Sequence, residues 1–227
     1  MTPGSRLFRA LAPIVALLWV VGAAPADAKA PKRVRTWTIS FQADTLGQAP
    51  ANATADDGLW RVIEDSTAAP LDSTGALPRL LRQSEGDESN AAHVIRFAKP
   101  SLRNGEVSTR FRILGGELDP SVGVLSRMDA KGRNGYLIRV SGATSKLIAH
   151  YLIYEKRRDL KSVDIDPPGE GEWHTLAVRH EGTTLTVLYD GEPRMTLRDE
   201  RHRKGFAGLW TEDDTVADFS EVSVTVR

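Results

Sequence analysis

The chain has 227 residues, of which 41% are hydrophobic and 26% are charged, a composition typical of soluble globular proteins. Its 30 basic and 30 acidic side chains cancel, so bulk charge predicts no nucleic-acid binding, which requires a basic excess on one face. The chain contains no cysteine, which excludes disulfide bonds, thiol catalysis and cysteine-ligated metals.

Residues 1–28 have the pattern of a secretory signal peptide. Arg6 and Arg9 precede an apolar run over residues 10–21, and the small residues of 26–28 form a cleavage site. The apolar run is too short to span a bilayer comfortably, since a spanning helix needs about 20 residues. We therefore expect export to the periplasm or the extracellular space without stable membrane insertion, and an uncleaved signal anchor is the alternative.

After the signal peptide, we expect residues 29–35 to form a linker and residues 36–227 to form a single domain. Nearly 200 residues are enough to bury a sizeable core without disulfide bonds. No internal repeat and no long amphipathic helix interrupts this stretch.

Residues 34–41 predict the first strand of the domain, because Trp37, Ile39 and Phe41 alternate with polar side chains. Residues 106–114 show the same division into an apolar face and a mostly polar face, as a strand of a two-layer sandwich does.

The centre of the chain predicts three successive strands separated by turns, over residues 122–128, 136–140 and 146–154. Strict alternation places Arg127 and Arg139 on the same face of neighbouring strands. A charged turn is expected at residues 155–159.

Residues 171–227 carry the clearest strand pattern, with β-branched residues alternating between turns that contain glycine. Asp190-Gly191 lies between two such runs and predicts a tight hairpin, because glycine accepts the positive φ of the turn. The stretch predicts antiparallel sheet with little helix.

Four segments of this stretch carry a resemblance: residues 173–178 (WHTLAV), 187–191 (VLYDG), 205–211 (GFAGLWT) and 219–224 (FSEVSV). They resemble the C-terminal half of a concanavalin A-like jelly roll. More narrowly, residues 37–227 resemble bacterial secreted 3-keto-disaccharide hydrolase-like and LamG-like domains. The resemblance implies an all-β jelly-roll sandwich of two antiparallel sheets that binds carbohydrate or cleaves glycosides oxidised at the 3-position. It also implies that the first strand, at residues 34–41, pairs with the last strand of the chain, because the ends of a jelly roll usually come together.

An ordinary glycosidase needs two carboxylates about 5 to 9 Å apart. Glycosidases of this jelly-roll type commonly carry them in a Glu-x-Asp-x-x-Glu strand. The nearest match, residues 85–90 (EGDESN), ends in Asn and lacks strand character, so we expect a solvated loop there and no ordinary retaining glucanase. Elimination from a 3-keto-glycoside needs only one base, because the keto group acidifies the neighbouring C–H. The candidate bases are His150, Asp213 and Asp218.

The sequence predicts no resident cofactor, with Ca²⁺ as the one candidate. Asp213, Asp214 and Asp218 place carboxylate oxygens close in sequence, and Ca²⁺ favours clustered oxygen ligands. The alternative is an acidic loop with no bound metal.

A carbohydrate site combines aromatic rings, which stack on sugars, with polar groups that bind hydroxyls. Six side chains of these types could line one concave sheet: Arg127, Tyr136, Arg139, His150, Tyr151 and Trp210. They predict a glycan or glycoconjugate as the partner. Three alternatives stay open: a hydrolase or lyase acting on 3-keto-glycosides, an adhesion or assembly module without a ligand, and arginines and tryptophans that serve only packing.

Overall fold

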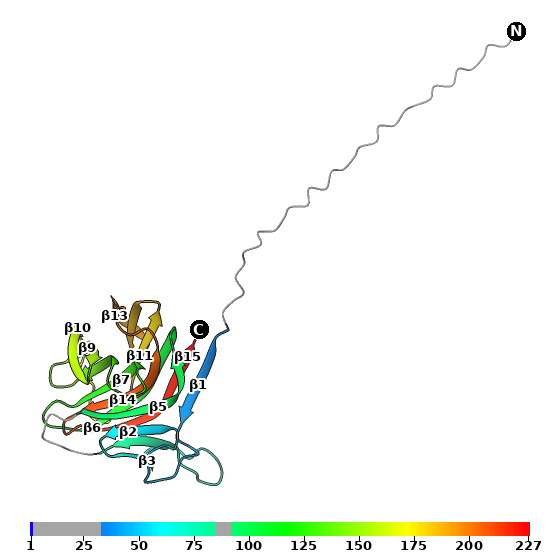
Figure 1. Cartoon of the computed structure of the whole chain (residues 1–227). Coiled ribbons are helices and arrows are strands. Elements are labelled where there is room, and N and C mark those ends of the chain that lie inside the picture. The colour runs from blue at the N-terminus through cyan, green and yellow to red at the C-terminus, as the bar shows by residue number, and fades with distance from the viewer. Residues whose placement is uncertain (2–32, 85–91) are drawn as a thin grey trace. The chain divides into compact units, whose positions relative to one another are not determined.

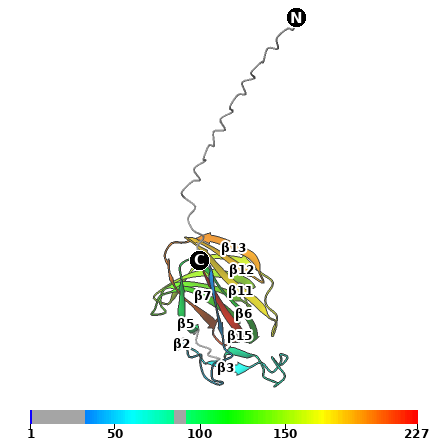
Figure 2. The same ribbon diagram turned by 90° about the vertical axis from the view of Figure 1, so that its right-hand side faces the viewer.

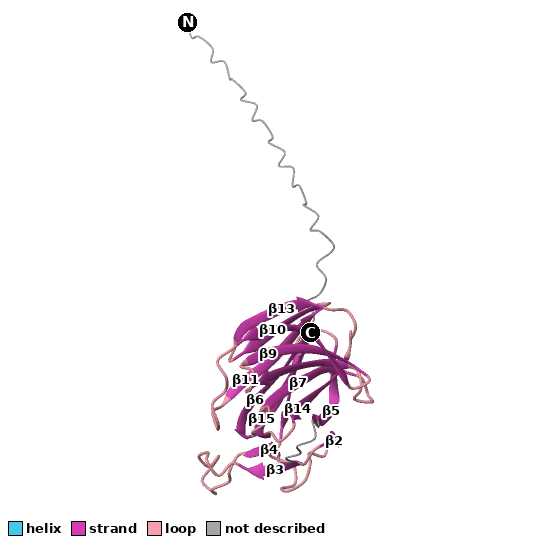
Figure 3. Ribbon diagram, turned by 90° about the vertical axis from the view of Figure 1, so that its left-hand side faces the viewer, coloured by secondary structure: helices cyan, strands magenta, loops and turns pink. Residues whose placement is uncertain are grey.

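The structure, a computed structural model, describes Met1 and residues 33–84 and 92–227. Within these residues the regular structure is fifteen β-strands and no helix, which confirms the all-β expectation (Figure 3). The same described ranges hold no helix long and apolar enough to cross a membrane. Arg33–Arg227 forms one compact unit. The expected signal peptide beyond Met1 and the 85–90 segment lie outside the described residues.

One sheet has eight strands: β1 (Arg35–Ser40), β3 (Trp60–Glu64), β4 (Arg79–Gln83), β6 (Gly105–Gly115), β11 (His174–Glu181), β12 (Thr184–Tyr189), β13 (Glu192–Arg198) and β15 (Val216–Val226). Seven of them run in the order β13-β12-β11-β6-β15-β4-β3, and β1 pairs with β15. Figure 2 shows β13, β12, β11, β6 and β15 side by side.

The other sheet has seven strands: β2 (Ala53–Asp57), β5 (Ala92–Leu102), β7 (Ser121–Met128), β8 (Gly135–Ser141), β9 (Lys146–Ile153), β10 (Lys156–Asp164) and β14 (Gly205–Glu212). They run in the order β10-β9-β8-β7-β14-β5-β2, and each neighbouring pair is antiparallel. Strands far apart in the chain, such as β14 and β7, are therefore neighbours.

The first and last strands of the domain pair, as expected (Figure 1). Their register runs from Arg35 opposite Val226 to Ser40 opposite Glu221. Ile39 is buried on the core side of β1 because alternate residues of a strand point to opposite faces.

The main core lies between the two sheets. Val124 of β7 and Leu209 of β14 meet Val107 of β6 and Val222 of β15 in one cluster of buried residues. Every residue of β7 is buried, so this strand is covered on both of its faces. On the outer face of the seven-stranded sheet, side chains from neighbouring strands therefore pack together and shield β7 from solvent.

Alternation along β7 breaks at Arg127, which corrects the predicted placement of this residue beside Arg139. Between the pairs Leu125 with Gly208 and Met128 with Phe206, β7 has one residue more than β14. The backbone of β7 accommodates the extra residue at Arg127, where φ is positive at 50°. Such a bulge shifts the facing of the residues that follow, and Met128 instead of Arg127 reaches the outer face.

The hairpin between β9 and β10 also differs from the prediction. The expected charged turn at residues 155–159 is a two-residue turn at Tyr154 and Glu155, with φ of 49° and 68°. β10 consequently begins at Lys156. No glycine or proline marks this turn in the sequence, so the usual turn signal is missing.

The tryptophans divide between core and surface. Trp60 is buried in the main core and packs beside Phe219, with ring centroids 5.7 Å apart. Trp173 is only half-buried, on the outer face of the eight-stranded sheet, where the guanidinium carbons of Arg110 and Arg112 lie 4.6 and 4.7 Å from its ring centroid.

Candidate functional site

A second apolar cluster covers the outer face of the seven-stranded sheet. Its buried members come from four strands: Leu125, Met128, Leu137, Leu152 and Trp210. Val94 of β5 is half-buried and packs against them. These side chains alternate with the residues that face the main core, which places the cluster on the side of the sheet that faces away from the core.

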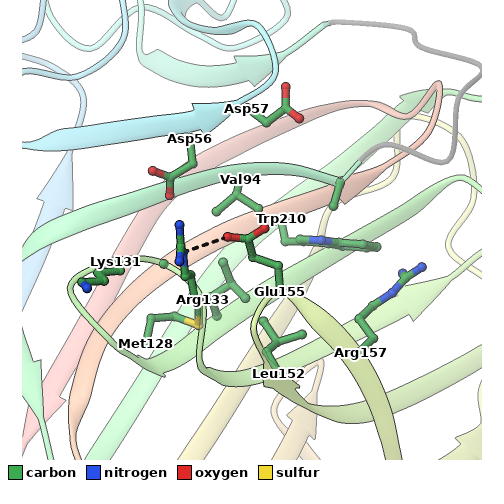
Figure 4. Close-up of a pocket in the computed structure, with 13 residues that line it drawn as sticks. Asp56, Asp57, Val94, Met128, Lys131, Arg133, Leu152, Glu155, Arg157 and Trp210 are labelled. Carbon is green, nitrogen blue, oxygen red and sulfur yellow. Dashed lines mark ion pairs between the residues drawn. The ribbon is translucent and has the colours of Figure 1, made fainter.

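A pocket of about 520 Å³ opens above this cluster. That volume is within the usual range for small-molecule sites, about 300 to 1,000 Å³. Val94, Leu125, Met128, Leu152 and Trp210 form its apolar floor (Figure 4). The pocket therefore has the volume of a small-molecule site, above a floor of closely packed apolar side chains.

Gly123 makes room for the floor. A Cβ atom at this position would lie 2.6 Å from Leu137 Cδ1, 3.0 Å from the carbonyl oxygen of Ile138 and 3.3 Å from Trp210 Cε3. Gly123 stands directly opposite Trp210 in the pairing of β7 with β14. Only a glycine lets the indole lie this close to the sheet.

Charged side chains line the rest of the pocket. Three are acidic and three are basic: Asp56, Asp57, Glu155, Lys131, Arg133 and Arg157. Arg133 Nε lies 3.3 Å from Glu155 Oε1, and Figure 4 marks this ion pair between two neighbouring residues of the lining. The lining as a whole is electrically balanced.

Two of these charges are held by residues just behind the lining. Asp56 forms a two-pronged ion pair with Arg96, whose guanidinium also donates to the carbonyl oxygen of Ala130 at 2.9 Å. Arg157 pairs with Glu212 and lies over the Trp210 ring, its guanidinium carbon 5.3 Å from the ring centroid. These contacts fix two sides of the rim.

Next to the pocket, Arg139 of β8 organises a buried polar cluster. Its Nη1 donates to Asp119 Oδ2 at 2.8 Å, to Ser121 Oγ at 2.9 Å and to Glu212 Oε2 at 2.7 Å. Burial acts to raise the pKa of Asp119, but the hydrogen bonds from Arg139 and Ser141 outweigh it and hold the pKa below its ordinary value. The cluster is a satisfied ion-pair network, so the charge of Arg139 is already matched.

His150 of β9 adjoins this cluster and is buried. Its Nε2 accepts a hydrogen bond from Arg139 Nε at 3.3 Å, and its Nδ1 lies 2.8 Å from Asp159 Oδ1. Burial lowers the pKa of His150 to about 4; the carboxylate of Asp159 opposes this shift, while Arg139 and Arg157 add to it. At neutral pH the ring is uncharged, with its proton on Nδ1 toward Asp159.

The structure brings together half of the predicted binding residues. Arg139, His150 and Trp210 share the outer face of the seven-stranded sheet, and Trp210 lines the pocket. Tyr136 faces the main core, and Tyr151 packs against the same core. The guanidinium carbon of Arg201 lies 4.2 Å from the centroid of the Tyr151 ring.

Arg127 and Tyr136 have structural partners instead of an open surface. The Arg127 guanidinium donates to the carbonyl oxygens of Arg103, His202 and Gly182, at 2.5 to 3.1 Å. The Tyr136 hydroxyl donates to Asp199 Oδ1 at 2.7 Å. Burial raises the pKa of Tyr136 to about 12, so its hydroxyl stays protonated.

The three candidate carboxylates for catalysis or calcium do not converge on one point. Asp218 is buried and bound by Arg82 and Arg112. Asp214 accepts the backbone N–H groups of residues 117 and 118. Burial, and then the neighbouring carboxylates, raise the pKa of Asp213. In the described part of the chain, no group of three or more His, Asp or Glu residues could hold a metal ion.

One contact between a hydroxyl and an imidazole could not be predicted from the sequence. His180 Nε2 lies 3.0 Å from Ser126 Oγ, and both residues are completely buried. Burial lowers the pKa of His180 to about 3. Because neither side chain reaches solvent, the pair stabilises the interior and offers no nucleophile to a substrate.

No protein-family model matches the chain, and no curated protein matches it either. Solved structures do match. The carbohydrate binding module CBM66 from Bacillus subtilis is 16% identical, with a TM-score of 0.61 over 76% of this chain and 95% of that chain. A β-glucanase from Bacillus licheniformis is 14% identical, with a TM-score of 0.52 over 83% of this chain and 97% of that chain.

The Ca²⁺-bound exoplasmic/lumenal domain of VIP36 is 15% identical, with a TM-score of 0.52 over 82% of this chain and 88% of that chain. The fold is a concanavalin A-like jelly roll. The jelly roll confirms the architecture that the sequence resemblance implied. The narrower assignment to 3-keto-disaccharide hydrolase-like or LamG-like domains stays a prediction.

Sequence reasoning missed most of the pocket floor of this jelly roll. Val94, Leu125, Met128 and Leu152 look like ordinary strand hydrophobics in the sequence. One signal was present: residues 122–125 (VGVL) are apolar without alternation, which indicates a strand covered on both faces. That pattern could have pointed to apolar surface on the outer side of the sheet.

Proposed function

We propose that the chain is an exported carbohydrate-binding module that holds a glycan or glycoconjugate in the pocket on the outer face of its seven-stranded sheet. The observation that carries the proposal is the apolar floor around Trp210 inside a ring of charged side chains. Sugar rings have one apolar face and a rim of hydroxyls, so a floor that packs on the ring and a rim that binds hydroxyls fit them together.

The charges of the lining favour an uncharged glycan. Three acidic and three basic side chains balance, and the Arg133–Glu155 ion pair already neutralises one of each sign. A strongly acidic sugar would have to compete with Glu155 for Arg133 and with Glu212 for Arg157. It would also meet the carboxylates of Asp56 and Asp57. We therefore expect a neutral saccharide, whose hydroxyls can both donate to carboxylates and accept from guanidinium groups.

Two features support this proposal from outside the pocket. Solved structures of the same jelly-roll fold include a carbohydrate binding module and a lumenal domain. The amino-terminal pattern of residues 1–28 favours export, to compartments where glycans are exposed.

The ion pairs, pKa and positions of the candidate bases favour binding of a glycan over cleavage of a 3-keto-glycoside. Asp218 is neutralised by two arginines, and His150 has a pKa of about 4 and already accepts a hydrogen bond from Arg139. The described residues that line the pocket do not include Asp218, His150 or Asp213. A general base works best when it touches the proton and has a pKa near the operating pH.

The test is a glycan array with the mature protein, followed by calorimetric titration of the strongest neutral glycan. Val94→Lys places a long side chain from a half-buried position into the pocket. The matched control is Ile63→Lys, a half-buried β-strand residue on the outer face of the other sheet. We expect binding to be lost in the first variant and kept in the second. Absence of binding to every glycan, or full binding by Val94→Lys, would overturn the proposal.

A further inference from the structure

Tyr154 is an aromatic side chain presented to solvent. It is 71% exposed, whereas Trp37, the other strongly exposed aromatic of the described residues, is 38% exposed. Its neighbour Ile153 is also exposed, at 41%. The turn between β9 and β10 therefore carries apolar surface that the fold does not bury.

The backbone of this turn is unfavourable for the residues that it carries. Tyr154 and Glu155 both have positive φ, at 49° and 68°. Two-residue hairpin turns with two positive φ values strongly favour Asn and Gly. A bulky residue in this region costs about 1 kcal/mol or more, and such strain is found at functional sites. An exposed tyrosine here contributes little to folding, so its presence calls for another role.

The turn is fixed to the rim of the pocket. The Tyr154 N–H donates to Asn134 Oδ1 at 3.1 Å, and the Glu155 N–H donates to the Arg133 carbonyl oxygen at 2.8 Å. The partner loop is itself rigid, because the carboxylate of Asp129 accepts hydrogen bonds from the backbone N–H groups of Lys131 and Arg133 and from the Asn134 amide. The backbone of the turn at residues 154–155 is therefore held in place relative to the pocket before any ligand arrives.

Tyr154 adjoins the pocket lining through its chain neighbour Glu155. Glu155 and Arg133 belong to the pocket lining, whereas the neighbouring Tyr154 does not (Figure 4). Glu155 is the second residue of the turn that carries Tyr154, so a ligand that extends from the floor toward the Arg133–Glu155 pair reaches this turn. A tyrosine ring suits this place, since it gives a large rigid contact with little loss of conformational entropy.

We propose that Tyr154 forms a second saccharide subsite at the rim, so that the ligand is an oligosaccharide with one unit in the pocket and the next stacked on this ring. The inference rests on the proposed function and narrows it from a sugar to a chain of at least two units. A turn whose backbone is already held in place adds affinity, because only the tyrosine side chain has to be ordered on binding.

Chain-length dependence tests this subsite. Calorimetric titrations use the monosaccharide, disaccharide and tetrasaccharide of one neutral glycan series chosen from the array. For the unmodified protein we expect the affinity to rise about tenfold from the monosaccharide to the tetrasaccharide, which corresponds to about 1.4 kcal/mol. Tyr154→Asn keeps a residue that tolerates positive φ but removes the ring. It should bind the monosaccharide unchanged and lose the tenfold gain.

Two controls separate the ring from other effects. Tyr154→Phe keeps the ring and should keep the chain-length gain. Leu71→Asn removes an exposed apolar side chain outside the pocket lining and should change nothing. If Tyr154→Asn binds the tetrasaccharide as tightly as the unmodified protein does, the subsite is wrong while the pocket proposal stands. If the unmodified protein binds no saccharide of any length, both proposals are wrong.

Discussion

Arg139 and Glu212 form a buried ion pair on the outer face of the seven-stranded sheet, with 2.7 Å between Nη1 and Oε2 and side chains only 12% and 8% exposed. The same nitrogen lies 2.8 Å from Asp119 Oδ2, so one guanidinium compensates two carboxylates. Glu212 in turn holds Arg157 at the pocket rim. The pair thus connects the stability of the sheet to the shape of the pocket.

Replacing Arg139 by Met should lower the free energy of unfolding by about 3 kcal/mol, because it leaves the largely buried Asp119 without a cation and Glu212 with Arg157 as its one remaining cation. Urea denaturation at pH 7 measures this change. The control is Arg203→Met, whose partner Glu200 lies 3.0 Å away on the exposed surface and whose loss should cost less than about 1 kcal/mol. Equal midpoints for the two variants would show that the Arg139 network contributes little.

His150 should make the fold sensitive to acid. Its folded pKa of about 4 lies below the ordinary value of 6.5, so the unfolded chain takes up the proton first as the pH falls. The stability from the neutral ring is complete above pH 6.5 and is lost between pH 6.5 and about 4, in total of order 3 kcal/mol. NMR titration of the imidazole C–H signals, assigned with His150→Gln, should show no shift from pH 8 to 5. A midpoint near 6.5 would contradict the buried neutral ring.

Arg127 should be a structural residue despite its place among the sequence candidates. Arg127→Met leaves the carbonyl oxygens of Arg103, His202 and Gly182 without this donor, and we expect a loss of about 3 kcal/mol in unfolding free energy. Glycan affinity, measured by calorimetry well below the melting temperature, should stay the same. A loss of affinity in a variant that is still folded would place Arg127 at the ligand.

Gly123→Ala should damage the pocket floor. The added methyl group would lie 2.6 Å from Leu137 Cδ1 and 3.3 Å from Trp210 Cε3, so the indole or the leucine must move. Overpacking of this kind costs about 1 to 3 kcal/mol. We expect a lower melting temperature together with weaker glycan binding. Gly182→Ala is the control for a glycine change, because nothing lies within 4 Å of its Cβ position; since φ there is 62°, it should lower stability and leave binding intact.

Much of this architecture could be predicted from the sequence, because period-two alternation and glycine turns are local signals. The hairpin at Asp190-Gly191 follows from them, whereas the pairing of the first and last strands was expected from the resemblance to a jelly roll. The bulge at Arg127 could not be predicted, because the extra residue of β7 is defined only against its distant partner β14. For the same reason the sequence placed Arg127 on the wrong face.

The candidate site was harder to predict than the fold. Arg139, His150 and Trp210 were found because their residue types are typical of sugar binding, yet only Trp210 lines the pocket. The floor residues Met128 and Leu152 have no distinguishing chemistry, and they are recognised only once the sheet order brings β7, β9 and β14 together. The strained turn at Tyr154 has no glycine to mark it.

The most direct test of the account is chemical-shift mapping with a neutral oligosaccharide from the array, read at the indole N–H signals of two tryptophans. Trp210 lies in the pocket floor, and Trp173 lies between Arg110 and Arg112 on the outer face of the opposite sheet. We predict that the Trp210 signal shifts in a saturable way and that the Trp173 signal does not move. A shift of Trp173 alone, or no shift of either signal at saturating glycan, would contradict a saccharide site on the seven-stranded sheet.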